Sequence, residues 1–159
     1  MTAACIFTGL LAGGDADRYI VQEPAWRHVN ILNWLEYSRH ADLGNGLIFY
    51  PFEAITGFIL LLASSAIIVI YKDAFKYPAF IAHMATLLSA TGLILTFFAA
   101  PIMLSLRTME NNPVLVQDAF DRFHFIGYLR AIVQVLSFCA CTWALRKLFA
   151  TSIAPNIKK

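Results

Sequence analysis

The sequence predicts an all-α fold: a four-helix transmembrane bundle that forms a single domain. Of the 159 residues, 59% are hydrophobic and only 14% are charged, a composition too apolar for a soluble domain of this length. A helix needs about 20 apolar residues to cross the hydrocarbon core of a bilayer, and four runs of about this length or more follow one another: residues 1–21, 47–71, 79–106 and 123–146. We expect one transmembrane domain over residues 1–149 and a cytoplasmic tail over residues 150–159.

The positions of the basic residues predict the orientation of this bundle. Lys72 and Lys76 lie between the second and third runs, and Arg146 and Lys147 follow the fourth run. Because Lys and Arg are enriched on the cytoplasmic side of membrane proteins, we expect a multi-pass protein of the cell membrane with both termini in the cytoplasm. No basic run is long enough to indicate nucleic-acid binding, so the lipid bilayer is the first partner that the sequence predicts.

The first run contains three ionisable residues within the stretch Gly13-Gly14-Asp15-Ala16-Asp17-Arg18. It lacks the basic start and the cleavage site of a signal peptide, so we interpret it as a membrane helix. Its small and polar residues share a face with Asp15, which predicts that this face packs inward. Asp17 points about 200° away and is expected near the outer headgroups or paired with Arg18. Pro24 is expected to end the helix.

Between the first and second runs, the sequence predicts a short interfacial helix. Residues 26–37 mix aromatic and aliphatic side chains with polar ones, a combination typical of helices that lie at the level of the headgroups. His40 and Asp42 follow this segment. They could line the mouth of a site, although ordinary loop chemistry is the favoured interpretation.

Polar residues of the second and fourth runs are predicted to face the interior of the bundle. Glu53 lies about two turns from the outer end of its helix, where an inward orientation keeps its carboxylate away from lipid. In the fourth run, the helical period places polar and small residues on one broad face and large apolar residues on the other. The inward face holds Asp121, His124, Gly127, Arg130, Ala131, Gln134 and Cys141, and the lipid face holds Phe125, Leu129, Ile132 and Leu136.

The three cysteines are an odd number, which argues against a disulfide framework. Cys139 and Cys141 lie two positions apart. On a helix their thiols point about 200° away from each other and make a poor metal chelate. We interpret them as packing residues.

Asp15, Glu53 and Arg130 are predicted to meet at one depth in the membrane. With a rise of about 1.5 Å per residue, each lies on the order of 10 Å below the outer end of its helix. An unpaired charge at that depth costs at least a few kcal/mol, but the acids exceed the arginine by one. A neutral acid, a cationic ligand or a bound metal ion would each resolve this excess.

These residues define a candidate site in which an acid or a histidine exchanges a proton and an arginine stabilises an anion. The candidate catalytic residues are Asp15, Glu53, Arg130 and His124. Tyr128 and Gln134 are candidate cofactor-binding residues. Two alternatives stay open for the cofactor: the site has none, or it holds a copper, iron or zinc ion bound by Asp15, Glu53 and His124. No His-x-x-x-His or Glu-x-x-His spacing supports a metal. The competing interpretation is a purely structural ion pair that locks the helices together.

The chain resembles a family of small four-helix membrane proteins that includes the fungal anthrone oxygenases. The resemblance runs through nearly the whole chain, and it is carried by residues 9–14, 19–24, 96–103 and 120–134. It implies an enzyme that inserts oxygen from dioxygen into an activated carbon of a polycyclic phenol without a conventional cofactor. Asp15 or Glu53 would be the base in that chemistry, with His124 as the alternative. Arg130 would hold the resulting phenolate or enolate.

Three functions follow from these observations. The first is an oxygenase or oxidoreductase-like enzyme that acts on a hydrophobic small molecule in a pocket near the outer leaflet. The aromatic residues predicted to line this pocket are Tyr19, Tyr50, Phe52, Phe123 and Tyr128. The second function is an accessory or assembly subunit of a larger membrane complex, which predicts a partner membrane subunit. The third is a small ion- or proton-coupled carrier, which predicts a homo-oligomer because four helices are few for alternating access.

Overall fold

The computed structural model describes residues 1–70 and 72–153, with the side chains of residues 1–70 and 77–150. Every regular element within these ranges is helical, which confirms the all-α class. The elements are α1 (Thr2–Asp17), a π-helical turn (Arg18–Gln22), α2 (Glu23–Arg27), α3 (Ile31–His40), a second π-helical turn (Ala41–Asn45), α4 (Gly46–Ile70), α5 (Lys72–Ser105) and α6 (Pro113–Ile153). Helix α6 thus continues into the predicted tail, of which residues 154–159 lie outside the described residues.

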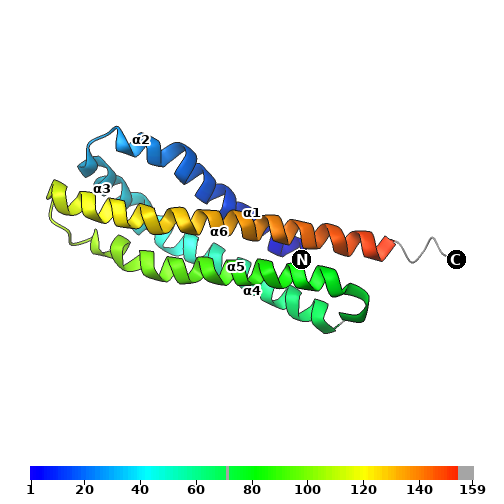
Figure 1. Ribbon diagram of the computed structural model, residues 1–159. Helices are drawn as coiled ribbons and strands as arrows, with labels where there is room; N and C mark the ends of the chain where they lie inside the picture. Colours follow the sequence, from blue (N-terminus) through cyan, green and yellow to red (C-terminus); the bar gives the residue numbers. More distant parts are fainter. Residues whose placement is uncertain (71, 154–159) are drawn as a thin grey trace.

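Helix α6 runs along the length of the bundle, with α1 on one side of it and α5 on the other (Figure 1). It packs against both of these helices, and α4 also packs against both of them. Helices α2 and α3 and the connection from α5 to α6 lie at one end of the bundle (Figure 1). The end of α4, the start of α5 and the end of α6 lie at the other.

Three stretches of the described chain are long and apolar enough to cross a membrane: Ile31–Ile70, Tyr77–Ser105 and Pro113–Ala150. The first stretch joins α3 to α4, and it bends at Gly44, where the backbone leaves the helical region (φ −87°, ψ −120°). Large apolar side chains cover the outside of the bundle, among them Ile48, Phe97 and Phe125. Such a surface suits contact with lipid and is unusual for a protein in water.

The first apolar run forms a longer helical segment than predicted. Helix α1 ends at Asp17, but the backbone stays helical through the π-helical turn and through α2. Pro24 is the second residue of α2, and the first turn of a helix tolerates the missing N–H of proline. The prediction that Pro24 ends the helix was therefore wrong, and the segment ends at Arg27 instead.

Helix α3 (Ile31–His40) overlaps the segment predicted to form a short interfacial helix, residues 26–37, and extends three residues beyond it. It begins after Asn30, whose side-chain oxygen accepts a hydrogen bond from the Leu32 N–H (2.9 Å) and so caps the helix. One face of α3 is deeply buried, because Trp34 and Leu35 pack into a core cluster with Phe120 of α6. Helix α3 is thus a packed part of the bundle.

Arg39 fastens α3 to the end of α5. Its guanidinium donates hydrogen bonds to the backbone oxygens of Leu106 (2.9 Å) and Met109 (2.6 Å) and to the side-chain oxygen of Asn111 (3.3 Å). Carbonyl groups at the end of a helix have no partner within the helix, and a cation there also complements the helix dipole. Arg39 therefore holds the connection between α5 and α6 beside α3.

The prediction of which face of α6 is buried and which is exposed is confirmed over most of the helix. The inward face is buried at His124, Gly127, Ala131, Gln134 and Cys141, and it is half-buried at Arg130. The predicted lipid face is exposed at Phe125, Leu129, Ile132 and Leu136. Asp121 is the exception, because it is exposed near the start of α6. The inward face of α1 is buried as predicted, at Ala4, Thr8, Ala12 and Asp15.

Candidate functional site

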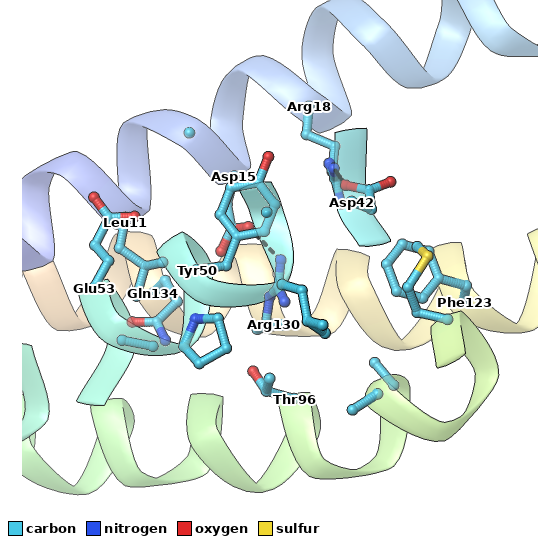
Figure 2. A pocket seen from close by; sticks show the side chains of 18 of the residues that line it. Leu11, Asp15, Arg18, Asp42, Tyr50, Glu53, Thr96, Phe123, Arg130 and Gln134 are labelled. Atoms are coloured by element: carbon cyan, nitrogen blue, oxygen red, sulfur yellow. Dashed lines mark hydrogen bonds and ion pairs between the residues drawn. The ribbon is translucent and has the colours of Figure 1, made fainter. Parts of the chain in front are cut away.

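A cavity of about 250 Å³ lies between α1, α4, α5 and α6, beside the two π-helical turns (Figure 2). This volume is several times the roughly 30 Å³ that one water molecule occupies in the liquid. Much of the wall is apolar, and six acidic or basic side chains interrupt it: Asp15, Asp17, Arg18, Asp42, Glu53 and Arg130. The cavity therefore combines the apolar wall and the few polar groups that are typical of small-molecule sites.

An ion pair joins α1 to α6 at the cavity. Arg130 donates a hydrogen bond from Nη2 to Oδ1 of Asp15 (2.6 Å), and Asp15 is 5% exposed. Figure 2 shows the two side chains pointing toward one another from their helices. Neither Oδ2 of Asp15 nor Nε of Arg130 has a hydrogen-bond partner within the described chain. Both atoms are buried and keep unused hydrogen-bonding capacity.

A second ion pair joins the first π-helical turn to the second. Arg18 donates a hydrogen bond to Oδ1 of Asp42, and both residues are buried. The guanidinium also lies 5.8, 5.5 and 6.0 Å from the ring centroids of Trp26, Tyr50 and Phe123, close enough for cation–π attraction. Arg18 is therefore held by one carboxylate and by aromatic rings.

Sequence reasoning missed this second pair. The expectation that Arg18 pairs with Asp17 near the surface was wrong, since Asp17 is exposed and accepts a hydrogen bond from Gln22 instead (2.6 Å). A signal was present in the sequence, because residues three apart lie on the same side of a helix. Arg18 follows Asp15 at that spacing, so the face that buries Asp15 also turns Arg18 inward. Asp42 was considered only as a possible residue at the mouth of a site, and it does line the cavity, whereas His40 does not. Nothing in the sequence indicated that Asp42 pairs with Arg18.

Glu53 is the acid that remains without a partner. It projects from α4, lines the cavity and is 6% exposed. No hydrogen bond or ion pair joins Glu53 to any other residue of the described chain. It lies close enough to Asp15 for the two carboxylates to repel one another. Because Arg130 and Arg18 each already face one aspartate, the excess acid expected from the sequence falls on Glu53.

Gln134 provides a neutral polar group in the same wall. It is 1% exposed and lines the cavity from α6, and its Oε1 has no hydrogen-bond partner in the part of the chain that the structure describes. Helix α5 approaches closely at this point, since a Cβ placed on Gly92 would overlap with the Gln134 side chain. Gly92 thus leaves the space that the Gln134 amide occupies.

His124 does not line the cavity. It is 3% exposed and lies among five aromatic rings, with ring centroids between 3.9 and 6.0 Å from its own: Tyr19, Trp26, Trp34, Phe120 and Phe123. Its Nδ1 is 2.8 Å from the backbone oxygen of Phe120 and donates a hydrogen bond to it, because that oxygen can only accept. The structure therefore places His124 in the core between α2, α3 and α6.

Of the other residues predicted for the site, some line the cavity and others do not. Tyr128 is 57% exposed and contacts the edge of the Tyr19 ring (6.2 Å between centroids), outside the cavity. Of the aromatic residues predicted as walls, Tyr50 and Phe123 line the cavity, whereas Tyr19, Phe52 and Tyr128 do not. The structure thus brings together four of the six candidate site residues: Asp15, Glu53, Arg130 and Gln134.

The residues proposed as metal ligands do not form a cluster. Among the described side chains, no three His, Cys, Asp or Glu residues lie close enough to hold one metal ion. Asp15 and Glu53 share the cavity, but His124 is directed into the aromatic core. The set of Asp15, Glu53 and His124 therefore does not fit a three-ligand metal site.

Comparisons with known proteins add no assignment. No family model, no curated protein and no solved structure matches the chain. The chemistry of the site consequently rests on its own geometry: an apolar cavity, two arginine–aspartate pairs with unused hydrogen-bonding atoms, and one buried carboxylate without a partner.

Proposed function

We propose that the protein is a membrane enzyme of the oxygenase or oxidoreductase kind that acts on a hydrophobic small molecule in this cavity. In this proposal the chain crosses the bilayer four times, with both ends in the cytoplasm. The continuous helical segment from Thr2 to Arg27 supplies the fourth crossing, since it exceeds the roughly 20 residues that a crossing requires. The cavity then opens near the outer leaflet, where a hydrophobic molecule can enter from the lipid.

The observation that carries the proposal is the buried, unpaired Glu53. An ionised carboxylate without a partner costs several kcal/mol in an apolar environment. Ion pairs that only lock helices together need no such residue, and the neighbouring pairs Asp15–Arg130 and Arg18–Asp42 already provide them. An acid retained at this cost beside an open cavity is a candidate for proton exchange with a ligand.

The geometry supports a division of roles between Glu53 and Arg130. Glu53 accepts a proton from an activated CH₂ group of the substrate. The guanidinium of Arg130, which lines the cavity, donates a hydrogen bond to the substrate oxygen on which the negative charge develops. Dioxygen is the second substrate: the CH₂ group becomes a carbonyl, and its two hydrogen atoms leave with the other oxygen atom as water. The resemblance to the family of the anthrone oxygenases supports this choice of reaction.

The test is an oxygen-consumption assay on the full chain in mild detergent, with anthrone as the probe because its CH₂ group lies between two aromatic rings. We expect the wild type to form the ketone and Glu53→Gln to be slower by about 10²- to 10⁴-fold, the usual contribution of a positioned base. Glu36→Gln is the matched control, since Glu36 is exposed and pairs only with His40 (3.0 Å).

Three outcomes would count against the proposal. Equal rates for the wild type and Glu53→Gln would remove the role of Glu53 as the base. A wild type that neither consumes oxygen nor binds the probe, but that co-purifies with another membrane protein, would support an accessory subunit instead. A proton flux in liposomes that depends on Glu53 would support a carrier.

A further inference from the structure

Two thiols meet in the half of the bundle away from the cavity. Cys5 of α1 and Cys141 of α6 lie 136 positions apart in the sequence, yet their Sγ atoms are only 2.9 Å apart. Both cysteines are free thiols. The sequence alone suggested a packing role for Cys141 and none for Cys5, because it does not show that α1 and α6 are neighbours at this level.

The same two helices also carry the Asp15–Arg130 ion pair. Asp15 follows Cys5 by ten residues, and Arg130 precedes Cys141 by eleven, which corresponds to about 15 Å along each helix. The two contacts therefore belong to one antiparallel interface with a single register. Any covalent bond between the thiols would fix the position of α1 against α6 and, with it, the position of Asp15 at the cavity.

The surroundings favour a bond between these two thiols over reactions of either thiol alone. Cys141 has no exposed surface, and it packs in a cluster of buried residues with Ala4, Leu61 and Ala85. Cys5 is partly exposed at the edge of this cluster. A disulfide requires an S–S distance of about 2.05 Å, so side-chain rotations that close the gap by roughly 0.9 Å suffice.

We propose that Cys5 and Cys141 form an oxidation site that links α1 to α6 by a reversible disulfide. The oxidant is a hydrophobic hydroperoxide, such as an oxidised lipid, that reaches the partly exposed Cys5 from the bilayer. The Cys5 sulfur takes the terminal oxygen and becomes a sulfenic acid, and the hydroperoxide leaves as an alcohol. The Cys141 sulfur then attacks the Cys5 sulfur, the S–S bond forms, and the oxygen leaves as water. Two thiols lose two hydrogen atoms, and one hydroperoxide is reduced to one alcohol and one water.

The test uses the full chain in mild detergent, cumene hydroperoxide as the probe and intact-mass spectrometry. We expect the mass to fall by about 2 Da, the two hydrogen atoms lost when a disulfide forms. A thiol reductant should restore the original mass. Peptide mapping under non-reducing conditions should find one cross-link, between Cys5 and Cys141.

Three variants sharpen the result. Cys139→Ser is the matched control, because Cys139 lies on the same helix but is exposed and away from Cys5; it should keep the cross-link. Cys5→Ser and Cys141→Ser should each lose it. The proposal is overturned if all three thiols of the treated wild type still react with N-ethylmaleimide after unfolding, or if the cross-link contains Cys139. The wild-type measurement decides the question even if a variant fails to fold.

Discussion

At the scale of single residues, the site is defined by which hydrogen-bonding atoms already have partners. Asp15 and Arg130 use one atom each on their mutual contact, so each keeps an atom for a further group. Arg18 is different, because aromatic rings surround its guanidinium in addition to Asp42. Arg18 is thus held by more contacts than Arg130, while Oδ2 of Asp42, like Oδ2 of Asp15, lacks a hydrogen-bond partner among the described residues.

We predict that Arg130→Gln destabilises the protein mainly by leaving Asp15 buried without its partner. Removing one member of a buried ion pair typically costs about 3–5 kcal/mol. Combining Arg130→Gln with Asp15→Asn removes the unpaired charge and should recover most of that loss. Thermal unfolding in detergent measures both effects. A double variant that is no more stable than Arg130→Gln would show that the unpaired charge is not the cause.

A second prediction at this scale concerns Gly127. A Cβ at this position would lie 2.8 Å from Cζ of Tyr19 and would overlap with the hydroxyl group. Gly127→Ala should therefore push Tyr19 out of its site, and overpacking of this kind costs about 1–3 kcal/mol. Gly57→Ala is the control, since its Cβ would make only ordinary contacts, the nearest at 3.6 Å from Phe7. In a denaturation experiment, the free energy of unfolding of Gly57→Ala should be clearly higher than that of Gly127→Ala.

The residues that sequence reasoning placed correctly are those whose orientation depends on one helix alone. The helical period of α6 predicts that Gln134 is buried, and the cost of a charge in lipid predicts that Glu53 is buried. The sequence could not separate His124 from Arg130, because both lie on one broad face of α6. They have different neighbours, namely the rings of α2 and α3 for His124 and the cavity for Arg130. Only the packing of other helices decides between them.

At the scale of elements, α3 and the end of α5 depend on one side chain. Arg39 donates hydrogen bonds to two backbone oxygens beyond the end of α5 and to Asn111. Depth and periodicity cannot predict such a contact, because its acceptors are backbone atoms of a connection far away in the sequence. Helix α3 is thus joined to a part of the chain far away in the sequence.

Arg39→Ala should therefore loosen the connection between α5 and α6. We expect faster amide hydrogen exchange at residues 106–112, since open backbone groups exchange more readily than bonded ones. Arg122→Ala is the control at the same end of the bundle, because Arg122 is exposed and forms only a long contact with Asp118 (3.5 Å). Unchanged exchange at residues 106–112 in Arg39→Ala would contradict the assigned role.

At the scale of the whole molecule, three described stretches are long and apolar enough to cross a membrane, and the segment from Thr2 to Arg27 is the proposed fourth crossing. The all-helical bundle and its apolar outer surface could be predicted from composition and from the lengths of the apolar runs. The first crossing is harder to judge, because α1 has only 16 residues and carries acids at its end. It becomes long enough through the π-helical turn and α2. The apolar run over residues 1–21 predicted the continuation past Asp17, whereas the part from Pro24 to Arg27 was not predicted.

Four crossings predict that the two ends of the protein lie on the same side of the membrane. A reporter that fluoresces only in the cytoplasm should therefore be bright when fused to either end. A dark amino-terminal fusion with a bright carboxyl-terminal fusion would instead indicate three crossings. A protease added outside intact cells should cleave a recognition site inserted at residues 108–112, because the connection between α5 and α6 then faces outward.

The π-helical turn at Arg18–Gln22 should tolerate substitutions of its exposed side chains. It should be sensitive to deletions, which change the number of residues in the turn. A π-helical turn accommodates one residue more than an α-helical turn does, and one residue corresponds to about 100° of rotation. Ile20 and Val21 are exposed, so other apolar residues can replace them without loss of contact. Deleting either one would rotate α2 by about 100° relative to α1 and carry Trp26 away from Arg18. Among variants of this chain, single-residue deletions within this turn should therefore be far more damaging than any substitution at the same two positions.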